Sequence, residues 1–292
     1  MLKLYEKTLY ARNYKPTTAV KLIQILRRFI KEAQIFKPEE ITIKTIEDYL
    51  CVLKETGRSS KTLGNHKSAI SGYCDFLNAR GILASNPAKF IKTLKSDETL
   101  PDFLPDNEVE LLLDLARYEK IYCEVVVALN TGLRMAELQR LEWRDIDLSN
   151  KQLVVRISKG KRPRTVPLNQ NVVKVLTAQK KKYGLMTWVF PGGKGGCQGR
   201  NVWSLNKMRS YKWWLRLSLD PIRDKIPTIA NIPKGRVGIG WHIMRHTFAT
   251  RLARAGVDIL KIQDWLGHQR LDTTMRYIHL ARNYDSDIEL IV

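Results

Sequence analysis

The chain has 292 residues and a formal net charge of +21. That length predicts two domains, because single hydrophobic cores commonly span about 100 to 200 residues. A composition of 44% hydrophobic and 27% charged residues excludes a largely disordered chain. With no N-terminal targeting signal and no apolar run near the roughly 20 residues of a membrane span, we expect a cytoplasmic protein.

The excess positive charge is spread along the chain. Residues 1–95 hold 18 lysines and arginines against 8 acids, and the remaining residues carry the other +11. A basic surplus in both halves favours nucleic acid as a partner of both domains, because neutralising phosphates releases condensed counterions. A basic surface that serves only solubility is the alternative interpretation.

The cysteines argue against a metal site. Cys51, Cys74, Cys123 and Cys197 are widely separated, with no CxxC pair and no histidine at ligand spacing beside them. We expect the first three to be reduced residues of a helical core.

Residues 1–92 predict a bundle of about four helices. Apolar residues recur at helical spacing in two early stretches, Val20, Ile23, Leu26, Phe29 and Ile30, then Ile46, Tyr49, Leu50 and Leu53. Ser59 and Ser60 precede a further helix whose apolar stripe contains Leu63, Ile70, Tyr73, Phe76 and Leu77. The opposite face carries groups suited to DNA phosphates or base edges, although a solvated face looks similar: Lys61, Asn65, His66 and Lys67.

Residues 93–106 predict a linker, since they contain prolines and acids without helical period. A second domain, 107–277, is predicted to be helical apart from a β-hairpin at 152–168. A Pro- and Gly-containing insert lies at about 220–240. A contact with DNA or with a neighbouring protomer is one interpretation of it, and a solvated loop is the commoner one. The expected fold class is therefore mainly α with a small β-hairpin or sheet.

The histidines indicate where the chemistry lies. Four of the five fall between residues 242 and 279. His242 and Arg245 are three apart on a predicted helix and share a face. The next helix stops at Gly267 and presents His268, and Tyr277 follows nine residues later. Taken singly, each residue fits an ordinary packed or solvated role, and only their joint order argues for a site.

Two further motifs precede this series, TGLRMAEL with Arg134 and SKGKRPRTVPL with Lys159, and HIMRH, LGH and TTMRYIHL follow them. The whole order resembles the tyrosine recombinase (phage integrase) family, which includes the Xer proteins, Cre and lambda-type integrases. The similarity covers nearly the whole chain. Residues 15–92, with SSKTLGNHKSAISGYCDFL and NPAKFIK, are less distinctively similar to the family's helical core-binding domain, a SAM-like bundle that closes a clamp around DNA.

The resemblance implies site-specific recombination through a 3′-phosphotyrosyl intermediate on Tyr277 and a Holliday junction, without cofactor, ATP or metal. Two guanidiniums suit the charge of a pentacoordinate phosphate, so we expect Arg134 and Arg245 to hold it, with His268 as a further donor. Glu137, one helical turn from Arg134, is expected to orient that arginine.

The residues that transfer protons are assigned by the resemblance alone. His242 assists Tyr277 as a base, and Lys159 protonates the leaving 5′-oxygen, with Lys161 as the rival candidate. We expect His246 and His279 to serve only packing or capping, and Tyr284 to be no nucleophile because it lacks the spacing from LGH.

The expected partner is double-stranded DNA with an inverted-repeat core site, bound by a homotetramer whose subunits are monomers when free. Basic hairpin residues join the helical candidates for DNA contact, namely Lys161, Arg162 and Arg164. The tail, 278–292, ends in the apolar DIELIV and is expected to dock on a neighbouring protomer.

Two other functions share parts of this pattern. A type IB topoisomerase would use the same catalytic logic as a monomer, but the core-binding similarity, the LGH histidine and the tail argue against it. A catalytically inactive DNA-binding regulator would not need the full residue set. Because the core-binding pattern starts near the first residue, we expect no arm-binding domain, and this favours an Xer-like or Cre-like enzyme or a compact integrase of a mobile element.

Overall fold

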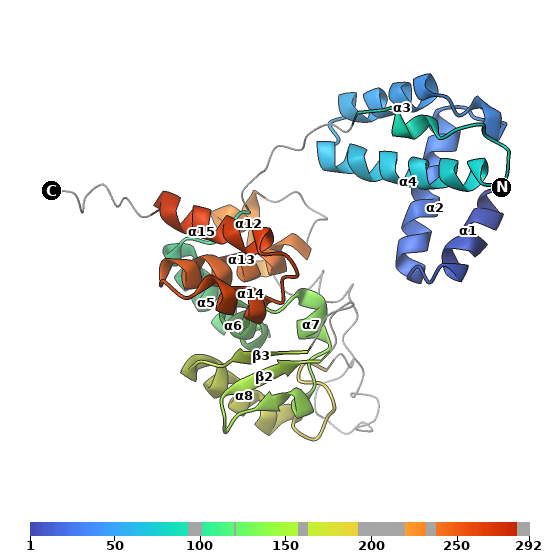
Figure 1. Ribbon diagram of the computed structural model, residues 1–292. Helices are drawn as coiled ribbons and strands as arrows, with labels where there is room; N and C mark the ends of the chain where they lie inside the picture. Colours follow the sequence, from blue (N-terminus) through green and yellow to red (C-terminus); the bar gives the residue numbers. More distant parts are fainter. Residues whose placement is uncertain (93–100, 120, 157–162, 192–219, 232–237, 285–292) are drawn as a thin grey trace. The chain divides into compact units, whose positions relative to one another are not determined.

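The computed structural model describes residues 1–92, 101–119, 121–156, 163–191, 220–231 and 238–284. The chain forms two compact units, Met1–Thr99 and Leu100–Val292, each with its own hydrophobic core. Both units are mainly helical, and the described strands form one small antiparallel sheet in the second unit (Figure 1). The expected fold class is confirmed.

Four α-helices form most of the first unit: α1 (Leu2–Ala11), α2 (Pro16–Glu32), α3 (Ile43–Glu55) and α4 (Ser60–Asn78), with short 3-10 helices at Pro38–Glu40 and Pro87–Lys89. Local chemistry sets where they begin. Pro16 opens α2, where its missing N–H costs no hydrogen bond. Before α4, the Ser59 hydroxyl accepts a hydrogen bond from the backbone N–H of Thr62.

The core of the first unit follows the predicted apolar stripes with two exceptions. The stripe expected on α4 is buried throughout. Val20, however, is 43% exposed, because the helical period that buries Ile23 places Ala19 in the core instead. Cys51 is exposed as well, since it lies two residues from the buried Tyr49 and so on another face of α3.

The second unit begins with three helices, α5 (Asp106–Arg117), α6 (Tyr122–Thr131) and α7 (Met135–Gln139), then a 3-10 turn at Trp143–Asp145. The sheet follows in the order β1 (Ile146–Asp147), β2 (Gln152–Val155), β3 (Arg164–Pro167), and α8 (Gln170–Tyr183) comes next. The chain closes with α11 (Asp220–Arg223), α12 (Pro227–Ala230), α13 (Gly238–Arg254), α14 (Ile259–Leu266) and α15 (Asp272–Tyr284).

The expected hairpin is present as the antiparallel pair β2–β3, in which Val155 lies opposite Arg164 and Leu153 opposite Val166. Leu153 and Val155 point into the core while their neighbours are half-buried, as the period of two along a strand requires. The sheet therefore fixes where β3 begins, and with it the position of Arg164.

Two segments expected to be linker or loop belong partly to the core. Leu104, within the expected linker, is 1% exposed, and its N–H donates to the Thr247 hydroxyl at 2.9 Å. In the insert, Ile222 of α11, Ile226 between the two helices and Ile229 of α12 are buried in the main core of the unit. The described part of this insert is thus packed against the core of the second unit.

Helix α13 is the element around which the second unit's C-terminal helices gather. Figure 1 shows α13, α14 and α15 side by side near α5 and α6, with β2, β3 and α8 at the other end of the unit. Phe248 and Ala249 of α13 share a small core with Ile262 of α14 and with Tyr277 and Leu280 of α15. This packing brings residues from three distant motifs to one place.

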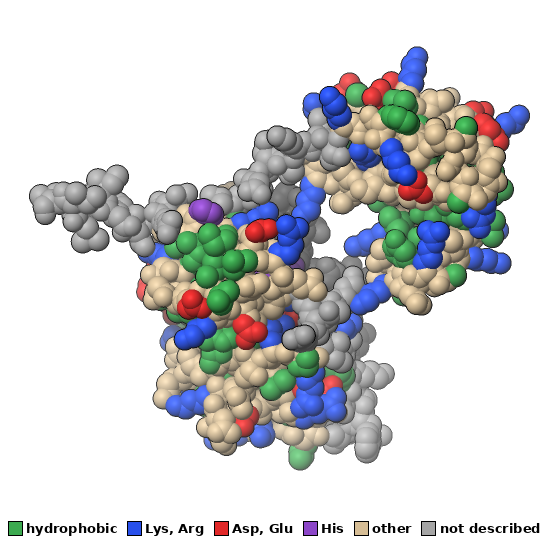
Figure 2. Space-filling model, viewed as in Figure 1, with side chains coloured by type: hydrophobic (Ala, Val, Ile, Leu, Met, Phe, Trp, Pro, Cys, Tyr) green, Lys and Arg blue, Asp and Glu red, His purple; other side chains and the backbone are tan. Residues whose placement is uncertain are grey.

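The surface is strongly basic, with 50 lysines and arginines against 29 acids in the whole chain. Figure 2 shows basic side chains scattered over the visible faces of both units, with fewer acidic ones among them. In the described part of the chain, no helix has the length and apolarity that crossing a membrane requires.

Candidate active site

Arg134 stands at the start of α7, where the chain turns out of α6. Gly132 ends α6 with a positive φ of 59°, which a residue without Cβ adopts readily. The backbone N–H of Arg134 donates to Glu137 Oε2 at 2.9 Å, and its Nη1 donates to Glu137 Oε1 at 2.9 Å. Its Nη2 donates to the carbonyl of Gly267 at 3.3 Å. The guanidinium is thereby oriented yet remains partly open to solvent.

Glu137 is shared by two arginines. Arg164 donates to both carboxylate oxygens, at 3.1 and 2.7 Å, and its Nε donates to the Trp265 carbonyl at 2.7 Å. Burial raises the pKa of Glu137, but the hydrogen bond and charge of Arg164, followed by those of Arg134, outweigh it and bring the pKa to about 2. The expected contact of Glu137 with Arg134 is present, and the carboxylate joins α7 to β3, while Arg164 in turn bonds to α14.

The expectation that Arg164 contacts DNA does not fit this structure. Its side chain is 4% exposed and its guanidinium is taken up by Glu137 and a backbone carbonyl. Moving a buried arginine from its paired carboxylate to a phosphate would be costly, because the carboxylate would then be buried without a partner. Arg164 is therefore part of the buried hydrogen-bond network around Glu137.

Arg245, on α13, is 4% exposed and is held by backbone carbonyls. Nη1 donates to Gly132 O and Nη2 to Leu266 O, both at 2.6 Å. Burial, followed by the charge of Arg134, lowers the pKa of Arg245 to about 9. A guanidinium that is buried and repelled by another one favours an anion nearby, because an anion would relieve both effects.

His268 is bound through both ring nitrogens. Its Nε2 lies 3.0 Å from Arg245 Nη2, and its Nδ1 lies 2.9 Å from the hydroxyl of Thr274, which is fully buried. A guanidinium nitrogen can only donate, so Nε2 must accept and the ring proton sits on Nδ1. In this arrangement His268 faces Arg245 as an acceptor. To act as the expected donor to a phosphate, His268 must either gain a proton or move away from Arg245.

Tyr277 lies within the same cluster. Its ring is parallel to that of His268, with centroids 6.1 Å apart, and it is 3% exposed. Burial raises the pKa of Tyr277, and the charges of Arg245, Arg134 and Arg276 only partly oppose this. The phenol is therefore protonated at neutral pH.

The hydroxyl of Tyr277 is hydrogen-bonded to His246 Nδ1 at 2.8 Å. Packing or capping was the role expected of His246, and the structure places it against the expected nucleophile instead. The signal was available in the sequence, because His246 follows four residues after His242 on one helix and so shares its face. His279, on α15, is exposed.

His242 is exposed at the edge of this cluster. Partial burial, followed by the charges of Arg245 and Arg134, lowers its pKa. Its imidazole is thus neutral at pH 7 and close to both arginines. The structure brings together five of the six expected catalytic residues, and the sixth, Lys159, lies outside the described residues with Lys161 and Arg162.

The expected DNA contacts of the first unit divide into two groups. Lys61 and Asn65 are exposed on α4. His66 is 7% exposed and hydrogen-bonded to the Tyr49 hydroxyl at 2.8 Å, so a DNA contact through it does not fit this structure. Lys67 is partly buried and donates to the carbonyl of Ile91.

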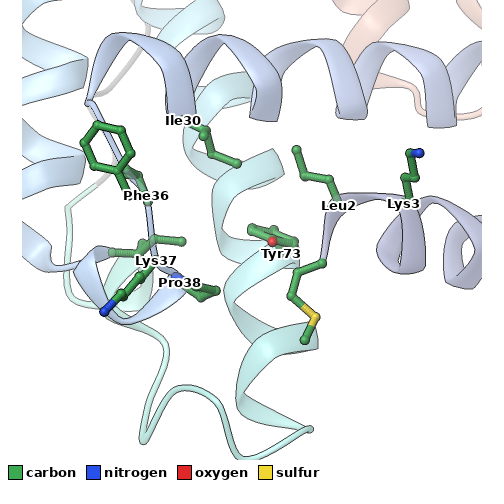
Figure 3. Close-up of a pocket in the computed structure, with 10 residues that line it drawn as sticks. Leu2, Lys3, Ile30, Phe36, Lys37, Pro38 and Tyr73 are labelled. Atoms are coloured by element: carbon green, nitrogen blue, oxygen red, sulfur yellow. The ribbon is translucent and has the colours of Figure 1, made fainter.

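A pocket in the first unit offers no comparable chemistry. It has a volume of ≈420 Å³ and lies between α1, α2, α4 and the segment from Ile35 to Pro38 (Figure 3). Lys3 and Lys37 are the charged side chains in its lining, and burial raises the pKa of Tyr73 to about 12. Among the described residues there is also no group of three or more His, Cys, Asp or Glu that could hold a metal ion.

Comparison with known proteins agrees with this geometry. Residues 102–283 match the model of the phage integrase family. A tyrosine recombinase of Thermosipho africanus is 30% identical over 246 residues, covering 82% of this chain and 80% of the relative. Tyrosine recombinase XerD of Staphylococcus saprophyticus is 28% identical, covering 87% of this chain and 84% of the relative.

Solved structures share the fold. The Tn1549 transposon integrase in complex with circular intermediate DNA has a TM-score of 0.71 at 22% identity, and each chain is covered to 94%. A lambda integrase tetramer bound to a Holliday junction has a TM-score of 0.70 at 20% identity, covering 94% of this chain and 75% of the integrase. The chain belongs to the phage integrase family and is a tyrosine recombinase, an enzyme of site-specific DNA recombination.

Proposed function

We propose that the enzyme cleaves and rejoins DNA strands through a covalent bond between Tyr277 and a backbone phosphate. The observation that carries this proposal is the convergence of Arg245, His268 and Tyr277. Arg245 is hydrogen-bonded to His268, whose ring lies parallel to that of Tyr277. The charges of Arg245 and Arg134 both act on the phenol.

Arg134 and Arg245 form the phosphate-binding group in this proposal. The pentacoordinate state of a phosphodiester concentrates negative charge on its non-bridging oxygens, and guanidiniums can donate to these in fork geometry. The side chain of Arg134 is 29% exposed and so is accessible to DNA, whereas Arg245 supplies positive charge from a buried position. Glu137 and Arg164 keep Arg134 in place.

The reaction forms a bond between Tyr277 Oη and phosphorus and breaks the bond from phosphorus to the 5′-oxygen. The resemblance to the family assigns protonation of that oxygen to Lys159, with Lys161 as the rival, and removal of the phenolic proton to His242. A 3′-phosphotyrosyl link and a free 5′-hydroxyl result. The phosphodiester energy is kept in the link, so strands can be rejoined in new pairs through a Holliday junction.

We further propose a substrate and an assembly for this chain. The substrate is a duplex with an inverted-repeat core site, contacted in part by Lys61 and Asn65, and four copies of the chain assemble on it. The DNA-bound lambda integrase tetramer supports this arrangement. Of the tail expected at 278–292, residues 278–284 belong to α15, where Leu280 and Ala281 are buried, and residues 285–292 lie outside the described residues. A DNA substrate also places the protein with the nucleoid in the cytoplasm.

Covalent trapping tests the proposed chemistry. Duplexes selected for binding from a random-sequence pool supply a site, and a nick beside the cleavage point lets the short 5′-product diffuse away. The wild type should then accumulate a protein–DNA adduct that resists denaturation. Tyr277→Phe should form none, whereas Tyr284→Phe should match the wild type. An adduct formed by Tyr277→Phe at the wild-type rate would remove the assignment of the nucleophile.

A further inference from the structure

His246 contacts the atom that is expected to attack DNA. Its Nδ1 lies 2.8 Å from Tyr277 Oη, and the two ring centroids are 5.8 Å apart at an interplanar angle of 38°. The contact joins α13 to α15, two helices that pack along each other in the same small core. His246 is half-buried and Tyr277 is buried, so water competes little for this hydrogen bond.

The surroundings decide which partner donates. Burial, followed by the charges of His242 and Arg245, lowers the pKa of His246 to about 4, so its ring is neutral at pH 7. The raised pKa of Tyr277 keeps the phenol protonated. The simplest pairing of a neutral imidazole with a phenol at this distance has the O–H donating to the Nδ1 lone pair. The proton of Tyr277 therefore already points at His246.

Within the described part of the site, the other polar neighbours of Tyr277 do not hydrogen-bond its hydroxyl. Among the hydrogen bonds of the described residues, that of the Tyr277 hydroxyl is with His246 and not with His242. The nearby arginines, Arg134 and Arg245, can only donate. His268 presents Nδ1 to Thr274 and Nε2 to Arg245, so both of its nitrogens are engaged.

We propose that His246 is a further catalytic residue, whose Nδ1 holds the Tyr277 hydroxyl and, in place of His242, receives its proton as the oxygen attacks phosphorus. This inference rests on the proposed function. As the O–P bond forms, the phenolic oxygen loses electron density and its proton becomes far more acidic, so even a weakly basic imidazole can accept it. The electron pair of the breaking bond leaves with the 5′-oxygen. In rejoining, His246 returns the proton to Tyr277.

Two substitutions separate holding the hydroxyl from receiving its proton. His246→Asn places an amide oxygen near the position of Nδ1, where it can accept a hydrogen bond but not a proton. His246→Leu removes both functions. We expect single-turnover cleavage of the nicked duplex to fall about a hundredfold or more with His246→Leu, since proton transfer to a placed base contributes about 10² to 10⁴. His246→Asn should stay at least about tenfold slower than the wild type.

A substrate with sulfur in place of the bridging 5′-oxygen locates the defect. A thiolate leaves without protonation, so this substrate should rescue Lys159→Ala but not His246→Leu. His279→Leu, which changes an exposed histidine on α15, is the matched control and should cleave both substrates at the wild-type rate. Thermal unfolding and DNA affinity, measured on every variant, show whether each one folds and binds.

The outcomes separate this inference from the proposed function. If the wild type forms no adduct, the proposed function fails. If the wild type forms the adduct and folded His246→Leu cleaves within about threefold of it, His246 is not a catalytic residue. Wild-type cleavage by His246→Asn would overturn proton acceptance, and rescue of His246→Leu by the sulfur substrate would move its action to the leaving group.

Discussion

At the scale of single residues, Thr274 determines which nitrogen of His268 carries the proton. Its buried hydroxyl is available to accept from Nδ1, and this leaves Nε2 free to accept from Arg245. Without Thr274, the alternative tautomer of His268 with its proton on Nε2 becomes accessible. In that tautomer the Nε2–H faces the N–H of Arg245, so two donors meet without an acceptor. The arrangement of Arg245 thus depends on a buried threonine that acts through His268.

Thr274→Val should therefore slow strand cleavage about three- to tenfold, the effect of losing one hydrogen bond of about 1 kcal/mol. The ¹⁵N chemical shifts of the His268 ring should change toward a mixture of tautomers. Thr274→Ser keeps the hydroxyl and is the control, with the wild-type tautomer expected. An unchanged ¹⁵N pattern in Thr274→Val would show that the hydroxyl does not set the tautomer.

At the scale of elements, the site depends on the ends of two helices meeting α13. Helix α6 ends at Gly132 and α14 ends at Gly267, both with positive φ. The carbonyls of Gly132 and Leu266 hold Arg245, while that of Gly267 accepts from Arg134. Helix C-termini carry a partial negative charge, which suits them to receive two guanidiniums.

Gly132→Ala should disrupt this junction. A Cβ at residue 132 would lie 2.4 Å from Phe248 Cδ1 and 2.9 Å from Leu266 Cδ2, in addition to the strain of a positive φ. We expect the free energy of unfolding to fall by about 2 to 4 kcal/mol, combining overpacking with left-handed backbone strain. Urea unfolding measures it, and cleavage should fall as Arg245 loses its partner.

Gly256→Ala is the matched control for this effect. Gly256 also has a positive φ, of 70°, but a Cβ there would meet nothing within 4 Å. Its substitution should cost only the backbone strain, about 1 to 2 kcal/mol, and leave cleavage unchanged. Equal losses in the two variants would mean that the clash with Phe248 and Leu266 is relieved at no cost.

At the scale of the whole molecule, acid should destabilise the second unit over two overlapping pH ranges. The pKa of His246 falls from 6.5 to about 4 on folding, chiefly by burial. Between these values the unfolded chain binds a proton that the folded one does not, so stability decreases as pH falls through this range. Glu137 has its pKa lowered from 4.5 to about 2, so the stability it contributes above pH 4.5 is lost toward pH 2.

The free energy of urea unfolding, measured between pH 8 and pH 3, tests both steps. His246→Asn should flatten the upper range in part, because the lowered pKa of His242 acts there too. Glu137→Gln should flatten only the lower range, and it should be less stable at pH 7 because it leaves the buried Arg164 without its carboxylate. Parallel curves for the wild type and Glu137→Gln below pH 4.5 would contradict the assigned pKa.

The amino-acid sequence by itself determined the helical character, the hairpin at 152–168 and the family of this chain. These properties follow from local periodicity and from the order of short motifs, both of which can be read directly from the amino-acid sequence. The stripe on α4 was correctly predicted because burial there repeats with the helical turn. The order of motifs from TGLR to Tyr277 indicated a recombinase because the sequence itself shows that order, while the roles of the individual residues stay predictions.

Only the tertiary structure decided which polar groups meet. His246 and Tyr277 are 31 residues apart, and Arg164 and Glu137 are 27 apart. A basic residue near a basic hairpin looks the same in sequence whether it faces a phosphate or a buried carboxylate, and His66 on α4 shows the same ambiguity. Hydrogen-bond partners far apart along the chain are selected by how helices and strands pack, and packing depends on all the side chains of a core at once.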